Sequence, residues 1–567
     1  MKFKSLFFLF LLFTAAILIT NQSPKRQTAT AQANDQLIYM PVINSGYDTD
    51  LIISSLEITQ AVQKADNSVP LVGSKPTIVR VYAQTIAGTP PSGVKVSLTA
   101  ARNNTLLGTI TSTAKIVPKN PQRSDYSSTF NLQLPDSWLS GTVEITATVD
   151  VENIVLEYKG NNNYNATLVF NSVPPLDVKI VPINYTHNPT GAFFPGQQQD
   201  RISDYLKRTY PVPSVNVSFR GAYNFQGDLR NGNDWVQLLY DVTDLKQTDN
   251  APNSQVYYGL VPIENGATQW FFGGIAGIGW VGWRASVALN LSQSSSGPLA
   301  AHEIGHNFGR NHAPCGNPAG VDASYPYAGA SIGEYGVDVL NGQLLLPSQY
   351  VDMMSYCSPE WVSDYTYQAL YNDQLVSGKV LSQARVDGLM IRVRMDEDGR
   401  PVLQPVYALT HTPFVGDVSD EYAVELLDVT GEVVGRYPLF TVLAEEEGVS
   451  ARMWGVSVPM PDVALGGVRV VAGKTAVSER VFTPAAFYTT ATPVLKDTAD
   501  SLVLSWPFSA PTLVRYTIDD GQTWITYALA AEGELVIEKE NLPAENGRFQ
   551  LIPADTTHAT LTLDYNN

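Results

Sequence analysis

Strict alternation of apolar and polar residues recurs towards both ends of this chain, and it limits those parts to sheets with one buried face. TVEITATV (142–149) and LMIRVRM (389–395) place apolar residues at every second position. Alternation over this length is typical of a half-buried β-strand. We therefore expect two β-rich regions, 48–172 and 376–567.

The chain is too long for one hydrophobic core, because single cores stop growing well below its 567 residues. After Pro174-Pro175, helix-like and strand-like spacings mix up to about residue 375, and TPAAFYTTATP (483–493) has the composition of a linker. The predicted fold class is multidomain α+β. Its modules are an N-terminal Ig-like β-sandwich at 48–172, a mixed domain at 173–375, and β-sandwiches at 376–487 and 488–567.

The N-terminal segment has the order of an export signal, with Lys2 and Lys4 before an apolar run. We predict a signal peptide at 1–33 ending in Ala-Gln-Ala, and a secreted protein with no stable membrane partner after cleavage. Retention of the segment as a cell-surface anchor is the alternative. The pattern says nothing of the oligomeric state.

Acidic residues outnumber basic ones, and the formal net charge is -18. Loss of 1–33 would remove four basic residues and no acid, giving -22. Such a charge argues against a nucleic-acid partner. Solubility of an exported protein explains it, and a cationic substrate is the alternative.

Three of the six histidines lie within AHEIGHNFGRNH (301–312). A helix starting near residue 297 would place His302 and His306 four residues apart, on one face. Glu303 is turned aside, where its carboxylate could reach a metal-bound water without ligating the metal. Gly309 can adopt positive φ, end the helix and bring His312 to the same metal. Three imidazoles with a fourth position open to water are typical of a catalytic zinc site.

HEIGHNFGRNH resembles the HExxHxxGxxH signature of the metzincin zinc endopeptidases at every specified position. The resemblance implies a metzincin-like domain at 173–375, with Zn²⁺ as cofactor and His302, His306 and His312 as ligands. It also implies peptide-bond hydrolysis in a protein or glycoprotein substrate. Ala313, which follows the third histidine, matches none of the familiar subfamilies, so the subfamily stays unassigned.

Metzincins also carry a methionine turn beneath the metal, and VDMMSYC (351–357) resembles it. The Met-Ser-Tyr order is similar to the serralysin form, which assigns the turn to Met354 rather than Met353. Tyr356 then inherits the stabilisation of the oxyanion. A buried core methionine and a surface tyrosine are the alternative.

Cys315 and Cys357 are the chain's two cysteines, and an even pair in an oxidising compartment favours a disulfide. The metzincin resemblance would bring together the two loops that hold them. Two free buried thiols are the alternative.

The resemblance assigns Glu303 as the general base, and an extended substrate would pair with an edge strand. ASVALNL (285–291) or the glycine-rich segment 273–283 is the candidate strand, and Trp280 and Trp283 either line subsites or pack in the core. Two other functions stay open. They are an adhesion or binding protein with an idle zinc site, and a zinc hydrolase acting on a non-peptide bond in a glycoprotein.

Overall fold

The structure, a computed structural model, describes residues 48–157, 160–185, 196–263, 271–291, 295–380, 385–396, 398–446, 448–544 and 546–566. The predicted signal peptide lies outside them. The chain from Tyr47 to Asn567 forms one compact unit, and its division into four modules stays a prediction. Among the described residues, no helix is both long and apolar enough to cross a membrane.

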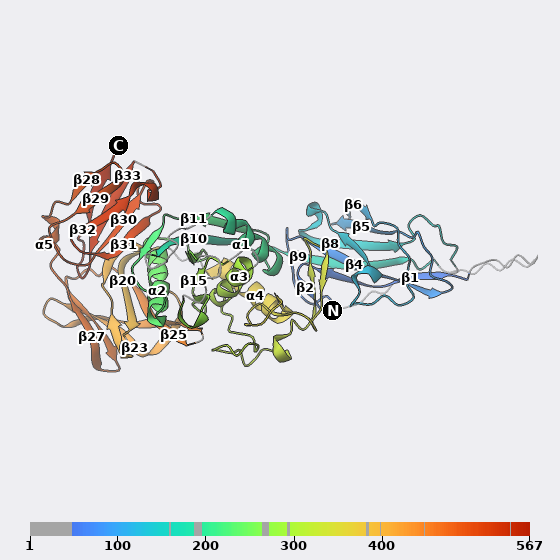
Figure 1. Ribbon diagram of the computed structural model, residues 1–567, viewed down its shortest axis with the longest axis horizontal. Coiled ribbons are helices and arrows are strands. Elements are labelled where there is room, and N and C mark those ends of the chain that lie inside the picture. The colour runs from blue at the N-terminus through green and yellow to red at the C-terminus, as the bar shows by residue number, and fades with distance from the viewer. Residues whose placement is uncertain are drawn as a thin grey trace, which may run out of the picture. The chain divides into compact units, whose positions relative to one another are not determined.

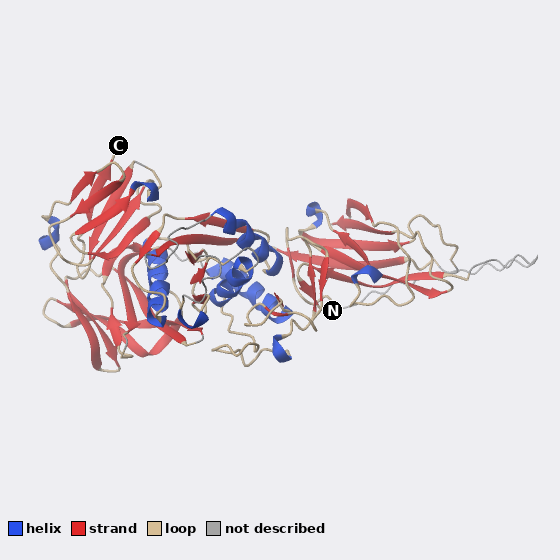
Figure 2. Cartoon of the chain, viewed as in Figure 1, coloured by secondary structure: helices blue, strands red, loops and turns tan. Residues whose placement is uncertain are grey.

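The predicted α+β fold class, with a metzincin-like domain as its centre, is wrong. Strands hold 46% of the residues and helices only 14%, and Figure 2 shows strands throughout the described chain. The helix-like spacings in the 173–375 region do give helices, but α1 (Gly196–Thr209), α2 (Gly232–Thr248) and α3 (Ser296–Asn307) hold only 12 to 17 residues each. Many short strands lie between these helices, in turn-rich parts of the sequence. Even the 173–375 region is therefore not mainly helical.

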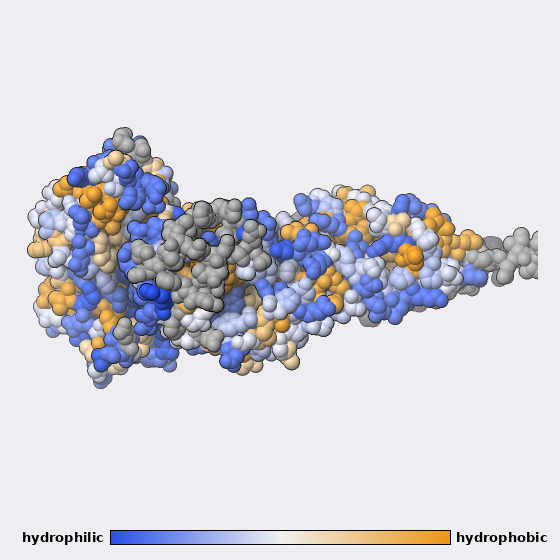
Figure 3. Space-filling model, viewed as in Figure 1, coloured by the Kyte–Doolittle hydropathy of each residue, from blue (hydrophilic) through white to orange (hydrophobic). Residues whose placement is uncertain are grey.

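Two sheets enclose the core of the N-terminal region (Figure 1). One has the order β1 (Asp50–Thr59), β4 (Ile78–Ala87), β7 (Phe130–Gln133), and the other β3 (Leu71–Val72), β9 (Asn163–Asn171), β8 (Gly141–Val149), β5 (Val96–Arg102), β6 (Thr105–Thr111). The alternating residues of β8 behave as expected, because Val143, Ile145, Ala147 and Val149 are all buried. Some large apolar residues elsewhere in this region are exposed, such as Leu106 and Val169, and Figure 3 shows hydrophobic patches among hydrophilic ones on the face that it draws.

A mostly parallel sheet forms the centre of the 173–375 region. Its order is β11 (Val215–Phe219), β10 (Leu176–Tyr185), β13 (Val256–Val261), β15 (Ala285–Leu289), β14 (Gly277–Gly279), and β12 (Tyr223–Phe225) also pairs with β10. Only β14 runs antiparallel to its neighbour, and it forms the edge. Parallel strands buried on both faces read as continuous apolar runs, as VYYGLV of β13 does.

Helices cover both faces of this sheet (Figure 1). Helices α1 (Gly196–Thr209) and α3 (Ser296–Asn307) share one apolar core with the sheet, and α2 (Gly232–Thr248) shares another with its opposite face. The remaining elements of the region are α4 (Asp364–Val380), β16 (Tyr335–Asp338), β17 (Gln343–Leu345), β18 (Val351–Asp352), β19 (Glu360–Trp361) and, from the N-terminal region, β2 (Val62–Gln63), which pairs with β16.

The C-terminal region consists of antiparallel sheets. The largest has the order β21 (Pro401–Leu403), β20 (Val386–Met395), β25 (Val449–Pro459), β24 (Val433–Glu446), β23 (Asp417–Asp428), β26 (Leu465–Ala472), β27 (Thr475–Val481), with β22 (Tyr407–His411) also on β20. Two smaller sheets follow α5 (Ala486–Thr489). One has the order β28 (Val494–Asp497), β29 (Ser501–Ser505), β32 (Glu534–Glu538). The other has the order β31 (Ile525–Ala531), β30 (Thr512–Thr517), β33 (Gly547–Pro553), β34 (Leu561–Tyr565). The β24–β25 hairpin matters for function, because its tip reaches the histidines on α3.

Candidate metal centre

Helix α3 carries the first two histidines and the glutamate of the motif. It begins at Ser296, one residue before the predicted start, and its buried Ala300, Ala301 and Ile304 pack into the core shared with α1. That apolar stripe fixes the rotation of the helix, so His302 and His306 both face away from α1. Their rings lie 4.9 Å apart between centroids.

Gly309 ends the helix in the conformation that its lack of a side chain permits. Its φ is +74°, and it donates a backbone hydrogen bond to His306 at 2.8 Å. The next residue, Arg310, donates to Gly305 at 3.1 Å, which completes a Schellman cap. This reversal of the chain brings His312 back to the helix, where its ring centroid lies 4.6 Å from that of His306.

The three imidazoles converge through their Nε2 atoms. Nε2 of His306 lies 3.2 Å from that of His302 and 3.1 Å from that of His312. Each Nδ1 faces a backbone carbonyl oxygen, at 2.9 Å in His302, 2.7 Å in His306 and 2.5 Å in His312. A carbonyl only accepts, so each Nδ1 carries the proton and each Nε2 presents a lone pair.

Burial favours the neutral form of His302. All three histidines are buried. Burial, followed by the neighbouring His306, lowers the pKa of His302 to about 3. Neutral imidazole is the form that binds a metal ion.

Glu446, at the tip of the β24–β25 hairpin, is a fourth member of the cluster that sequence reasoning missed. Its Oε1 lies 3.5 Å from Nε2 of His306 and 3.4 Å from Nε2 of His312. Its other carboxylate oxygen accepts a hydrogen bond from the Tyr356 hydroxyl. Glu446 stands in a β-module far along the chain, and no spacing motif connects it to the histidines.

A cation fits this cluster. The ligand atoms of His302, His306, His312 and Glu446 lie within 4.8 Å of one another. Oε1 of Glu446 is buried without a hydrogen-bond partner, and it faces lone pairs rather than N–H groups. A carboxylate oxygen and three nitrogen lone pairs repel one another unless a positive charge stands between them. The four residues could therefore bind a metal ion.

Glu303 lies beside the cluster and does not belong to the group of ligand atoms. It is 2% exposed, and its Oε2 has no hydrogen-bond partner. Burial, and then the nearby Glu446, raise its pKa well above the ordinary value. Gly277 of β14 leaves room for this carboxylate, because a Cβ there would stand 2.3 Å from Oε1 of Glu303.

Met354 lies beneath α3. A Cβ on Gly305 would stand 2.4 Å from its sulfur, so the absence of a side chain at Gly305 admits the methionine. Met353 contributes its carbonyl, which accepts from Nδ1 of His302 at 2.9 Å. Both methionines are buried.

The predicted disulfide between Cys315 and Cys357 is confirmed. It joins the loop after His312 to the loop after Met354, and the same loops share two backbone bonds, from Ala313 to Met354 and from Tyr356 to Cys315. The Tyr356 ring lies 4.9 Å from that of His312 between centroids. The loop that carries Tyr356 is thus fastened next to the third histidine.

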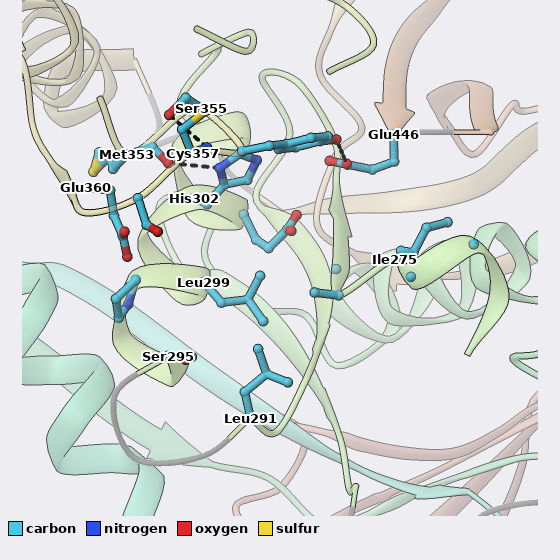
Figure 4. Close-up of a pocket in the computed structure, with 18 residues that line it drawn as sticks. Ile275, Leu291, Ser295, Leu299, His302, Met353, Ser355, Cys357, Glu360 and Glu446 are labelled. Carbon is cyan, nitrogen blue, oxygen red and sulfur yellow. Dashed lines mark hydrogen bonds between the residues drawn. The ribbon is translucent and has the colours of Figure 1, made fainter. Parts of the chain in front are cut away.

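A cavity of about 430 Å³ opens beside His302 and Glu303 (Figure 4). Its described lining includes Glu303, Glu360 and Glu446 but no lysine or arginine, and apolar side chains line much of the rest. The edge strand beside it is β14, from the glycine-rich segment, because β15 lies between β13 and β14. Trp280 and Trp283 are buried in the core and do not line the cavity.

The hairpin that supplies Glu446 also contacts the chain directly after β14. Val281 donates its backbone N–H to the carbonyl of Leu443 at 2.8 Å, and the two residues form an antiparallel bridge. The β24–β25 hairpin thus occupies the free edge just beyond β14, and its tip stands over the histidines.

Comparison with known proteins assigns neither a family nor a function to this chain. No protein-family model and no curated protein matches the sequence. Among solved structures, a CARDB domain from Pyrococcus furiosus in complex with di-metal ions is 25% identical over 22% of this chain and 94% of its own, with a TM-score of 0.15. A Parabacteroides merdae β-glucuronidase is 9% identical over 91% of this chain and 77% of its own, also at 0.15. Likenesses this low carry no argument about fold or activity.

Proposed function

We propose that this chain is a secreted zinc-dependent endopeptidase. One observation carries the proposal: three imidazole lone pairs converge next to a buried glutamate with an unpartnered oxygen, at the wall of a cavity. Imidazole ligands suit Zn²⁺, and three of them with an acidic neighbour are typical of hydrolytic zinc sites. The HExxHxxGxxH resemblance to metzincins supports the same conclusion.

Zinc held by His302, His306 and His312 would supply a Lewis acid that polarises a peptide carbonyl and acidifies water. Glu303 is the general base: its Oε2 takes a proton from water and then delivers it to the leaving amine. The raised pKa of Glu303 suits the second half of this task, since the carboxyl group must hold the proton before giving it up. The protonated Nδ1 atoms on backbone carbonyls fix the rings in place.

Substrate alignment falls to β14. As an edge strand it offers backbone groups to an extended peptide, and it passes directly beside Glu303 and His306. Tyr356, on the loop fastened by the disulfide, is the donor for the oxyanion once its hydroxyl is free of Glu446. The substrate class is a protein or glycoprotein, and the disulfide supports an oxidising compartment outside the cell.

The Glu446 carboxylate must move away from the histidine cluster before the enzyme can hydrolyse a substrate. Its carboxylate stands at the histidine cluster and holds the Tyr356 hydroxyl, so it occupies the position that water and substrate need. The β24–β25 hairpin also takes up the edge beyond β14. We therefore expect the arrangement seen here to be a self-blocked form, which becomes active when the hairpin tip moves aside.

The same residue favours a second candidate function. A zinc site closed by four protein ligands is typical of a structural role. If Glu446 never leaves, the metal fastens the C-terminal β-module to α3, and the chain is an exported binding protein with an idle zinc site.

Glu303→Gln separates the two functions. We expect the variant to keep its zinc and to lose casein cleavage by at least about a hundredfold, the usual contribution of a general base. Glu144→Gln, an exposed carboxylate on β8, is the matched control. Equal cleavage by wild type and Glu303→Gln would refute the assigned base, and zinc binding without cleavage by wild type or Glu446→Gln would favour the structural role.

A further inference from the structure

The cavity beside the histidines extends away from Glu446. In Figure 4, Glu446 stands on one side of His302, while Glu360, Ser295 and Leu299 surround the other part of the cavity. The blocking hairpin therefore leaves this part open. The whole cavity, at about 430 Å³, falls within the range of small-ligand pockets, roughly 300–1,000 Å³, and this part of it is the side open to a large side chain.

The walls of this part are apolar and its polar end is acidic. Leu291, Pro298 and Leu299 supply apolar surface, and Ser358 and Glu360 supply oxygen atoms. Among the described residues, no lysine or arginine forms an ion pair with Glu360, and none lines the cavity. Two further carboxylates at the same cavity, Glu303 and Glu446, each have a buried oxygen without a partner.

This combination matches a long cationic side chain. The methylene stem of lysine or arginine packs on apolar walls while its charged head seeks a carboxylate. An acidic side chain at the Glu360 end of the cavity would instead bring two like charges together, and no lysine or arginine of the described lining offsets them. A neutral apolar side chain would fill the walls but leave Glu360 unpaired.

On the premise of the proposed function, we infer that Glu360 determines specificity and that the enzyme cleaves peptides with arginine or lysine next to the scissile bond. Glu360 pairs with the substrate cation at the end of the cavity. Glu303, which belongs to the histidine motif, acts on the scissile bond as the general base and does not select the side chain. The acidity of the chain, with its net charge of -18, would draw such substrates from solution.

The test uses the full chain loaded with zinc and a set of quenched-fluorescent peptides that differ at one position, which holds Arg, Lys, Gln, Leu or Glu. Cleavage by wild type is measured as kcat/KM, and binding to the Glu303→Gln variant as fluorescence anisotropy. We expect the Arg peptide to exceed the Gln peptide about tenfold or more in both measurements.

Glu360→Gln should reduce the Arg-to-Gln ratio about tenfold, and Glu360→Lys should favour the Glu peptide. Glu144→Gln, an exposed carboxylate on β8, is the control and should keep the wild-type ratio. A ratio near one in wild type, or an unchanged ratio in Glu360→Gln, would overturn the inference and leave the proposed function standing. If no peptide is cleaved but binding prefers arginine and depends on Glu360, the pocket is supported and the proposed function fails.

Discussion

Oε1 of Glu446 lies 3.4 Å from Nε2 of His312, although Glu446 belongs to the C-terminal β-rich region and His312 to the mixed region at 173–375. The contact places a carboxylate from the β24–β25 hairpin at the point where three imidazoles meet. A hairpin from the C-terminal β-rich region therefore reaches into the candidate metal centre.

Removing the charge of Glu446 should raise activity. Glu446→Gln keeps the shape of the side chain but weakens its hold on a cation, so water and substrate reach the histidines more easily. We expect kcat/KM for casein-derived peptides to increase about tenfold, equivalent to about 1.4 kcal/mol. The exposed neighbour Glu445→Gln is the matched control. A loss of activity in Glu446→Gln would show that the carboxylate assists the reaction.

Adding a side chain to Gly309 should loosen the site. An alanine at a φ of +74° costs roughly 1–2 kcal/mol of backbone strain, and no atom lies near enough to add a clash. Because this residue turns the chain towards His312, zinc affinity should fall along with stability, as measured by chelator competition and urea unfolding. Gly473→Ala imposes the same kind of strain at φ +63° on a remote turn, and zinc affinity should not change there. Equal zinc affinity in both variants would contradict the role of Gly309.

The motif residues could be found from sequence because local backbone geometry determines their relation. His302 and His306 meet through helical spacing, and His312 joins them through one glycine turn. Glu446 could not be found this way, since its approach depends on how a distant hairpin packs. The fold class failed for a related reason: periodicity locates single helices and strands correctly, but it does not weigh the many short strands between them.

Breaking the disulfide should destabilise the chain. Cys315 and Cys357 close a loop with a sequence separation of 42, and the chain-entropy model gives about 4 kcal/mol for such a loop. The double variant Cys315→Ser, Cys357→Ser should unfold at lower urea concentration and show weaker zinc binding. Ser324→Ala, at an exposed position within the loop that the disulfide closes, keeps the crosslink and serves as control. A double variant as stable as wild type would show that packing alone holds the two loops.

Acid should destabilise the fold partly through His411. This buried imidazole contacts the Leu409 carbonyl and the Ser457 hydroxyl, and burial lowers its pKa to about 4. As the pH falls from 6.5 to about 4, the unfolded chain takes up a proton that the folded chain refuses, so stability is lost over that window, by on the order of 3 kcal/mol. Above pH 6.5 the residue contributes no pH dependence.

His411→Gln should flatten the fall in unfolding free energy between pH 6.5 and 4, measured by urea titration at each pH. The exposed His558→Asn is the control and should keep the wild-type slope. An unchanged slope in His411→Gln would mean that other groups account for the acid sensitivity.

Metal analysis of the purified full chain tests the convergence of the three histidines most directly. After dialysis against zinc and then buffer, plasma mass spectrometry should find about one zinc per wild-type chain, and less than about a tenth of that in the triple variant His302→Ala, His306→Ala, His312→Ala. Circular dichroism would establish that the triple variant is folded. A folded wild-type chain without zinc, or a triple variant that retains a full equivalent, would contradict the proposed metal centre.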